Sequence, residues 1–373
     1  MSDCKTVRLG EILQIQPKSK IKAGDGSKVG IFPFYTCSNE LTKKIDTADY
    51  EGPALVFGTG GNASVHYVNG KFSTSTDCLV YKTNSNTNLS LINKYLRANI
   101  YLLENGFKGA GLKHISRDYI SNIEIKLPDS TIQEKVVSQL DLLESNITKH
   151  KTILEKLDLL IKSRFIEMFG DPVTNPKGWN EVKITELCKS PDDIKCGPFG
   201  TQLCKDEYQK SGIPVFGIPQ INSSFNVSPT DFLTNTKAEK LDDYSLVCGD
   251  IAMSRKGNVG KCAIYSGQDK GIIHSDVVRL RVDNSVCNPV YLMNQLHISP
   301  KIETQISNVS SGAIMAGINV TKLKNIIVYN PPILMQNDFA NFVQQIDKSK
   351  FAVQKSLEKA ETLYKSLMQE YFG

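Results

Sequence analysis

The chain repeats its own pattern at an offset of 203 residues, the separation of Lys108 and Ser311, and this repeat constrains the fold more than any other feature. No gap is needed from about residue 108 to the C-terminus. The matched positions are Lys108-Gly109-Ala110 and Ser311-Gly312-Ala313, Ile115 and Ile318, Asn122-Ile123 and Asn325-Ile326, Pro128 and Pro331, Gln133 and Gln336, and Phe169-Gly170 and Phe372-Gly373. A period this long exceeds that of solenoid repeats, so the repeating unit is a whole domain plus a helix.

The composition is that of a globular protein with two or three domains, given 373 residues and 22% charged side chains. No apolar run approaches the roughly 18 residues needed to cross a membrane, and the start of the chain lacks a signal pattern. Nine cysteines without a Cys-x-x-Cys pair indicate reduced thiols, so we expect a cytoplasmic location. We expect no metal, because the spacing of Cys188, Cys196 and Cys204 fits no usual zinc pattern.

The net charge of +5 lies mainly in residues 1–130, where 16 basic side chains exceed 12 acidic ones. This weak excess is compatible with nucleic acid, but simple solubility explains it equally well.

Two long segments, 131–169 and 334–372, have the heptad pattern of a coiled coil. Each begins after proline and ends in Phe-Gly, as expected of a helix. The first seam is Val136, Leu140, Leu143, Ile147, His150, Leu154, Leu157, Ile161, Arg164 and Met168; the second is Phe339, Val343, Ile346, Lys350, Val353, Leu357, Ala360, Tyr364, Leu367 and Tyr371. We predict an antiparallel pair within one chain. The alternative is that each helix packs on its own domain.

The two globular segments, 1–130 and about 179–330, each predict a mixed α+β domain. The expected strands are 54–57, 78–81, 123–127, 251–253, 277–282 and 326–329, and the expected helices are 91–103 and 290–296. Weaker matches pair Val7–Ile12 with Val182–Leu187, Gly61-Asn62 with Gly257-Asn258, and Asp77–Val80 with Asp276–Arg279. Residues 170–180 form a turn-rich connector.

This ordered set, domain then proline-led helix, occurring twice, resembles the DNA-specificity (S) subunit of type I restriction–modification enzymes. The residues that carry the resemblance are Asn122–Pro128 with Gln133-Glu134-Lys135, Leu323–Pro332 with Gln336, Gly197–Leu203 and Gly212–Phe216. The second copy departs from the family pattern at Tyr329–Gln336, which lacks the more acidic Pro-Leu-x-Glu-Gln type.

The resemblance implies two similar target-recognition domains in tandem, each followed by a spacer helix, with pseudo-twofold symmetry. It implies a first recognition domain at 1–130, a spacer helix at 131–170, a linker and second recognition domain at 171–333, and a spacer helix at 334–373. Each domain would read half of a bipartite, non-palindromic site on double-stranded DNA, and the helix pair would set the spacing.

The same resemblance implies a non-catalytic subunit that serves DNA methylation and phage defence. Two methyltransferase (M) subunits and restriction/translocase (R) subunits would be its partners, and no membrane is involved. S-adenosylmethionine, ATP and Mg²⁺ would bind those partners, with no cofactor on this chain. The alternatives are the specificity chain of a fused type IIB-like cleaving–modifying system, and a non-catalytic coiled-coil adaptor.

Candidate DNA-contacting residues combine small residues for close approach with amide, hydroxyl or cationic groups for bases and phosphates. In the first domain they are Ser38, Asn39, Thr59, Gly60, Gly61, Asn62, Ser64, Lys108, Lys113 and Arg117. In the second domain they are Thr201, Gln202, Ser254, Arg255, Lys256 and Asn258. A solvated turn is the alternative for each.

Two short stretches resemble catalytic sequence motifs but lack features that those motifs require. Asn330-Pro331-Pro332-Ile333 resembles an adenine-methyltransferase signature, but it lacks the aromatic residue that stacks on a flipped base. Pro191–Lys195 contains the letters of a nuclease motif, but adjacent aspartates cannot converge on one metal from separate strands. We therefore predict no catalytic residue.

Overall fold

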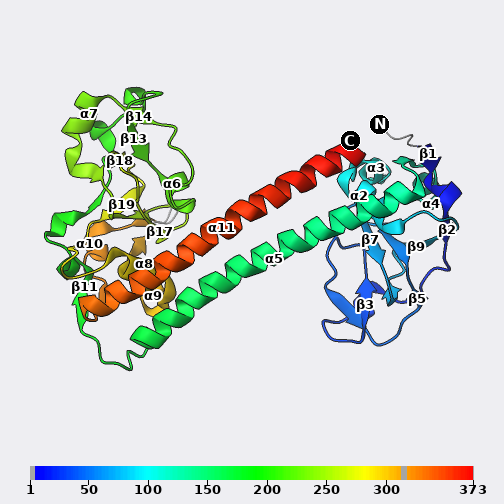
Figure 1. Cartoon of the computed structure of the whole chain (residues 1–373), viewed down its shortest axis with the longest axis horizontal. Helices are drawn as coiled ribbons and strands as arrows, with labels where there is room; N and C mark the ends of the chain where they lie inside the picture. Colours follow the sequence, from blue (N-terminus) through cyan, green and yellow to red (C-terminus); the bar gives the residue numbers. More distant parts are fainter. Residues whose placement is uncertain (1–4, 312–316, 373) are drawn as a thin grey trace. The chain divides into compact units, whose positions relative to one another are not determined.

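The computed structural model describes residues 5–311 and 317–372 (Figure 1). The start of the chain, the Gly312-Ala313 part of the repeat and Gly373 lie outside these ranges. The chain divides into two compact units, Met1–Lys151 with Gln354–Gly373, and Thr152–Val353. Each unit holds one globular domain and a segment of each long helix.

The first domain contains two four-stranded sheets and a two-stranded pair. One sheet has the order β2 (Leu13–Ile15), β9 (Cys78–Thr83), β6 (Ala54–Gly58), β7 (Ser64–Val68). The other has the order β4 (Lys43–Ile45), β3 (Phe32–Tyr35), β8 (Lys71–Thr74), β5 (Tyr50–Glu51). The pair is β1 (Lys5–Arg8) with β10 (Glu124–Leu127). All neighbours are antiparallel except β3 and β8, which are parallel.

The second domain has the same topology. One sheet has the order β12 (Ile194–Cys196), β19 (Val277–Leu280), β16 (Ile251–Ser254), β17 (Cys262–Ile264). The other has the order β14 (Phe232–Leu233), β13 (Ile213–Phe216), β18 (Gly271–Ile273), β15 (Ser245–Leu246), with β13 and β18 parallel. β11 (Glu181–Lys183) pairs with β22 (Ile327–Tyr329), and β20 (Ser310–Ser311) with β21 (Gly317–Ile318). Identical strand order confirms that the two domains share one fold.

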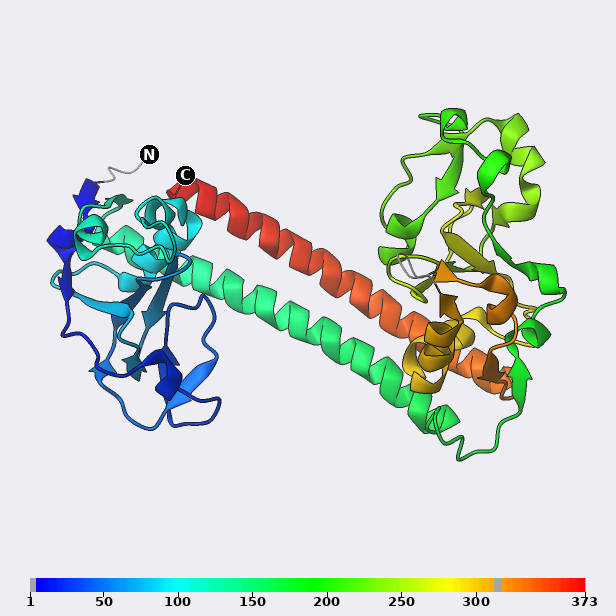
Figure 2. The same cartoon turned by 180° about the vertical axis from the view of Figure 1, so that it is seen from behind.

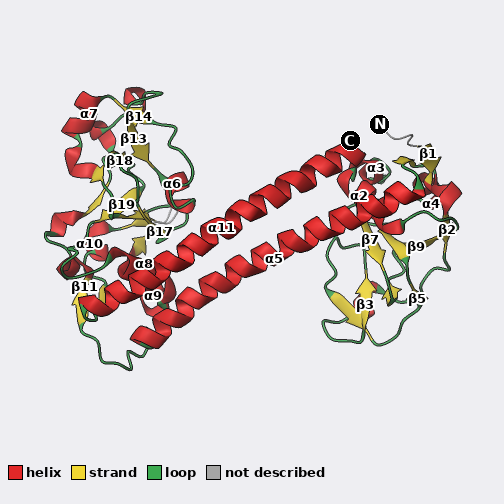
Figure 3. Cartoon of the chain, viewed as in Figure 1, coloured by secondary structure: helices red, strands yellow, loops and turns green. Residues whose placement is uncertain are grey.

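Short helices lie among the strands of each domain, and they pack on the sheets that contain β6 and β16 (Figure 3). The first domain has α1 (Leu9–Ile12), α2 (Leu89–Ala98), α3 (Tyr101–Glu104), α4 (Arg117–Ser121) and η1 (Ala23–Asp25). The second has α6 (Ile218–Asn222), α7 (Asn235–Lys240), α8 (Pro289–Ile298), α9 (Pro300–Val309), α10 (Val320–Leu323), η2 (Ile184–Leu187), η3 (Pro191–Asp193), η4 (Gly200–Gln202), η5 (Lys205–Glu207) and η6 (Asp242–Tyr244).

The single helix predicted over 91–103 is wrong, because the structure breaks it into α2 and α3 at Asn99. This residue leaves helical geometry (φ −114°, ψ 47°), and its side-chain amide donates to the carbonyls of Tyr95 and Phe372. The competing side-chain hydrogen bonds explain the break.

The predicted long helices are confirmed as α5 (Ser130–Phe169) and α11 (Ile333–Phe372), each 40 residues and about 60 Å long. Every predicted seam side chain is buried or half-buried. In each unit the segments of the two helices lie side by side in both views (Figures 1 and 2).

Within the first unit, contacts between the helices run antiparallel. The Tyr364 hydroxyl donates to Glu144 at 2.6 Å, and Lys151 pairs with Glu361 at 3.1 Å. Lys94 on α2, whose side chain is buried, joins the same cluster by binding Glu144 at 2.7 Å. Three elements therefore meet around one carboxylate.

Within the second unit, the helix segments are also antiparallel, and their contacts are mainly aromatic. The rings of Phe165 and Phe339 lie 5.5 Å apart, and the Arg164 guanidinium lies 5.7 Å from the Phe342 ring. Lys350, the polar interruption of the second seam, forms an ion pair with Asp158. Arg164 and Lys350, two of the polar seam residues, thus each contact the other helix.

The repeated glutamine docks each long helix on its own domain. In the first unit, Gln133 Oε1 accepts from the backbone N–H of Asn88 (3.0 Å), and its Nε2 donates to the Pro128 carbonyl (2.8 Å). In the second unit, Gln336 repeats both bonds, to Asn288 (2.8 Å) and Pro331 (2.7 Å). Asn88 and Asn288 are the N-caps of α2 and α8. The Asn-Pro-Pro stretch is therefore a helix start, as predicted.

The far end of each long helix packs on the helix of the other copy. Phe372 at the end of α11 lies 5.6 Å from Tyr95 on α2, and Phe169 at the end of α5 lies 4.7 Å from Tyr291 on α8. Gly170 follows α5 with φ 84°, the left-handed conformation that ends many helices.

Candidate nucleic-acid interface

In the first domain, two loops that the sequence analysis selected separately are locked together. The β6–β7 loop (residues 59–63) binds the loop 108–115, because Ile115 N–H donates to Thr59 O and Gly61 N–H donates to Lys113 O, both at 3.1 Å. Lys108 and His114 exchange backbone hydrogen bonds of 2.9 and 3.0 Å across the second loop. The result is a hairpin fixed against a tight turn, with Gly61 at φ 81°.

This surface of the first domain is basic and polar. Asn62, Lys108, Lys113 and Arg117 are exposed. None of the three cations forms an ion pair within residues 5–311 and 317–372. Unpaired, exposed cations around a glycine-rich turn suit contacts to phosphates.

Ser38 and Asn39 are exposed. They follow Cys37, which is hydrogen-bonded to the same turn and so holds them beside it. The Cys37 thiol contacts Asp77 O at 3.0 Å and accepts from Gly60 N–H at 3.4 Å. A hydrogen bond from Cys78 is the main cause that lowers the pKa of Cys37 to about 6. Burial and the same contact raise the pKa of Cys78.

The second domain builds the equivalent turn with different side chains. Arg255 replaces Thr59: its N–H donates to Asp276 O at 2.8 Å, and its carbonyl accepts from Ile318 N–H at 3.0 Å. Lys256 forms an isolated antiparallel β-bridge with Gly317, and Gly60 forms the equivalent β-bridge with His114. Gly257 has φ 67°, like Gly61. The predicted correspondence of the two loops is confirmed.

Arg255 is held by its own domain. Its Nε donates to Ile318 O at 3.1 Å, its Nη1 approaches Ser275 O at 3.5 Å, and its guanidinium lies 5.9 Å from the Phe199 ring. Lys256 is likewise paired with Asp276 at 2.9 Å. Both cations help to fix the turn, and Asn258 is exposed beside them.

Phe199 is a residue that the sequence analysis missed. It is 55% exposed and lies just before Thr201 and Gln202, so its contact with Arg255 brings the loop 197–203 to the β16–β17 turn. Thr201 and Gln202 are exposed, and Gln202 accepts from the Tyr244 hydroxyl at 3.1 Å. An exposed aromatic residue in a polar loop was the available signal.

Three predicted contact residues are not accessible. Gly60 is buried in the β6–β7 turn, where its N–H is bonded to Cys37. Ser64 begins β7 and is 1% exposed, and Ser254 ends β16 and is 0% exposed. Both faces of the strand are covered at these positions, since the neighbouring Val65 and Met253 are buried as well. A duplex cannot reach either hydroxyl in this structure, so neither belongs to the interface that we propose.

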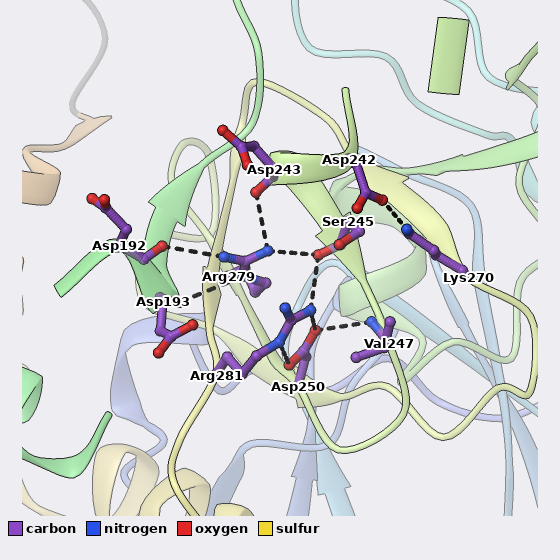
Figure 4. A network of polar contacts seen from close by, with 10 residues as sticks. All are labelled: Asp192, Asp193, Asp242, Asp243, Ser245, Val247, Asp250, Lys270, Arg279 and Arg281. Carbon is purple, nitrogen blue, oxygen red and sulfur yellow. Dashed lines mark hydrogen bonds and ion pairs between the residues drawn. The ribbon is translucent and has the colours of Figure 1, made fainter. Parts of the chain in front are cut away.

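A buried arginine, Arg279 on β19, joins the two sheets of the second domain (Figure 4). Its guanidinium donates to the main-chain carbonyls of Asp192 (3.2 Å), Asp193 (3.5 Å), Asp243 (3.1 Å) and Ser245 (2.9 Å). Burial lowers the pKa of Arg279, so these carbonyls are needed to satisfy the charge. The Pro191–Lys195 stretch therefore contributes its main chain to the fold.

Beside it, Arg281 and Asp250 form a two-bonded ion pair of 2.8 and 2.7 Å. The Asp250 carboxylate is 3% exposed and also accepts from Val247 N–H. This pair raises the pKa of Arg281. The matched position of Arg279 in the first domain is the buried Val80, so the network is particular to the second domain.

Comparison with known proteins decides the family. The family model described as "Type I restriction modification DNA specificity domain" matches residues 1–159 and again residues 176–361. The chain belongs to this type I DNA-specificity family. The two matches follow the two copies of the repeat.

Two relatives of the type I specificity family align over nearly the whole chain, and a third over about half of it. The EcoDI specificity subunit of a type I restriction enzyme of Escherichia coli is 23% identical over 99% of this chain and 88% of its own length. A putative type I specificity subunit of Mycoplasma pneumoniae is 24% identical over 98% and 96%. A putative subunit of Methanocaldococcus jannaschii is 27% identical, but that match spans 51% of this chain and 48% of the relative.

Solved structures agree on the fold. The S subunit of a type I system from M. genitalium matches with a TM-score of 0.70 at 12% identity, covering 100% of this chain and 96% of that one. A chain of another type I system gives 0.53 at 17% identity, covering 99% and 97%. These comparisons do not favour the fused system or the adaptor. In the described residues, no helix combines the length and apolarity required to span a bilayer.

Proposed function

We propose that this specificity chain recognises a bipartite, non-palindromic DNA site, with one half-site read by each domain. The observation that carries the proposal is that two domains of identical topology present unlike side chains at equivalent turns. Thr59 and Gly60 in the first domain correspond to Arg255 and Lys256 in the second. Because different side chains select different bases, equivalent turns would read different half-sites.

The contacts that we propose fall into two kinds. Lys108, Lys113 and Arg117 are unpaired within the described chain and would hold phosphates, which fix position without selecting sequence. Asn62, Asn258 and Gln202 are exposed amides that would reach base edges. Ser38, Asn39 and Thr201 complete the exposed polar set. Arg255 would act from its fixed position in the turn.

We propose that the chain has no catalytic activity and works with methyltransferase and restriction subunits. Exposed apolar side chains on the long helices support a protein-docking role: in the second unit, Leu159 is 61% and Phe351 is 71% exposed. S-adenosylmethionine, ATP and Mg²⁺ would be bound by those partners. The eight described cysteines are all free thiols, which supports a cytoplasmic location.

The test is to map methylated adenines in a host that has no other methylation and expresses the chain with a type I methyltransferase subunit. We expect one motif with two unlike specific halves separated by unspecified bases. The control is the methyltransferase subunit alone, which should leave the genome unmethylated. A continuous or palindromic motif, or methylation without this chain, would contradict the proposal.

A further inference from the structure

Leu112 is a large apolar side chain that the first domain presents to solvent. It is 74% exposed and lies in the loop 108–115, between Gly111 and Lys113. The neighbouring Gly109, Ala110 and Gly111 are small and exposed, so Leu112 is the large apolar side chain at this end of the hairpin. An exposed leucine contributes little to the stability of the domain, so its replacement should leave the fold intact.

The backbone on both sides of Leu112 is rigidly held. Lys108 and His114 exchange two hydrogen bonds, and Lys113 O accepts from Gly61 N–H. His114 Nδ1 also contacts Thr59 O at 3.2 Å. A Cβ on Gly60 would lie 3.8 Å from Leu112 Cδ2, so the leucine lies over the β6–β7 turn. The hydrogen-bonded backbone and the β6–β7 turn therefore restrain the position of the Leu112 side chain.

Cations flank this leucine. Lys108 and Lys113 lie on the same hairpin, Arg117 opens the next helix, and all three are exposed without an ion pair in the described residues. A base-paired duplex has anionic phosphates on its outside and stacked, apolar base faces inside. Unpaired cations around an apolar side chain are complementary to both features. A protein partner with an apolar surface would not require the three cations.

The repeat supplies an independent observation. At the offset of 203 residues, Leu112 corresponds to Met315. Position 315 lies outside the described residues, so this comparison concerns sequence alone. Leucine and methionine are both among the residues that proteins insert between base pairs.

We propose that Leu112 is a wedge that enters a base step of the half-site read by the first domain, while Lys108 and Lys113 hold the adjacent phosphates. This inference rests on the proposed function. A wedge needs an exposed apolar group, a rigid backing and cations that hold the backbone against the push. The hairpin 108–114 has all three, whereas contact with a thymine methyl group would not require the rigid backing.

The experiment uses the full chain assembled with its methyltransferase subunits and a duplex carrying the mapped site. 2-Aminopurine is placed at successive positions of each half-site, except at the methylated adenines and their neighbours, which the methyltransferase subunits unstack by base flipping. Its fluorescence reports unstacking. We expect the wild-type complex to unstack one step in a single half-site. Leu112→Ala should abolish that signal and weaken specific binding about tenfold, with an unchanged salt dependence. Val29→Ala, which removes a more exposed apolar side chain of the same domain, should change neither.

The remaining outcomes separate the two proposals. Lys113→Ala should lower the slope of affinity against salt by about one, as expected for a phosphate contact. Wild-type unstacking that persists in Leu112→Ala would overturn the wedge and leave the proposed function intact. So would an effect of Leu112→Ala that appears only with thymine and disappears with deoxyuridine. A wild-type complex that binds the site no better than random duplex would overturn both.

Discussion

At the scale of single residues, Cys37 is a thiol of lowered pKa that contacts the candidate interface of the first domain. Its sulfur accepts from Gly60 N–H of the turn, and a hydrogen bond with Cys78 is the first cause of its lowered pKa. These hydrogen bonds stabilise the thiolate and hold the pKa at about 6. The thiolate is the reactive form, so Cys37 combines reactivity with a place beside Ser38, Asn39 and Thr59.

We expect iodoacetamide to alkylate Cys37 with a rate that rises through about pH 6, because the thiolate forms above that pH. Cys78→Ala removes the first cause of the lowered pKa and should move the midpoint to higher pH. Peptide mass spectrometry over pH 5–9 measures the alkylation rate of Cys37 in the wild type and in the variant. The exposed Cys204 in the same sample shows that the reagent is active. A midpoint that stays in place in Cys78→Ala would show that Cys78 does not set it.

Individual contacts could be predicted only where the repeat supplied a second copy. Gly61 and Gly257 were matched by sequence, and the structure gives both the left-handed conformation. Burial of Ser64 and Ser254 was not predictable, because the sequence does not state that both faces of these strands are covered. The position of Cys37 depends on packing between segments more than 20 residues apart, which leaves no local signal.

At the scale of elements, the glutamine clamp explains why Gln133 and Gln336 recur. Each is buried and joins the first turn of a long helix to the N-terminus of a domain helix. An apolar replacement would leave a backbone N–H of the α8 start and a proline carbonyl without partners. Such losses cost about 1–3 kcal/mol each.

We therefore expect Gln336→Leu to lower the free energy of unfolding of the second unit by about 2 kcal/mol. Gln344→Leu, an exposed position on the same helix, is the matched control and should change stability by less than about 0.5 kcal/mol. Chemical denaturation followed by circular dichroism provides both values. Equal stability of the two variants would mean that the clamp contributes nothing.

The long helices were predictable almost to the residue, because a heptad pattern over 40 residues is a strong signal. The prediction of 131–169 and 334–372 compares with Ser130–Phe169 and Ile333–Phe372. The second sheet of each domain was missed, since strands such as β4 and β14 have three and two residues. Strands this short carry no periodicity, and their pairing depends on distant partners.

At the scale of the whole molecule, the duplication explains both the fold and the proposed function. Two domains with one strand order carry different turns, Thr59-Gly60 and Arg255-Lys256, and each unit contains antiparallel segments of α5 and α11. If the domains read and the helices set the spacing, then reading and spacing should be separable by mutation.

The most direct measurement is methylome mapping of a chain with one extra heptad after Lys151 and another after Val353. A whole heptad in each helix keeps the seven-residue repeat of both seams. Seven residues add about 10 Å to a helix, or about three base pairs. The control is a seven-residue insertion in the connector 170–180, which should leave the motif unchanged. The account predicts the same two half-sites with a gap longer by about three base pairs. Altered half-sites, or an active variant with the original gap, would contradict it.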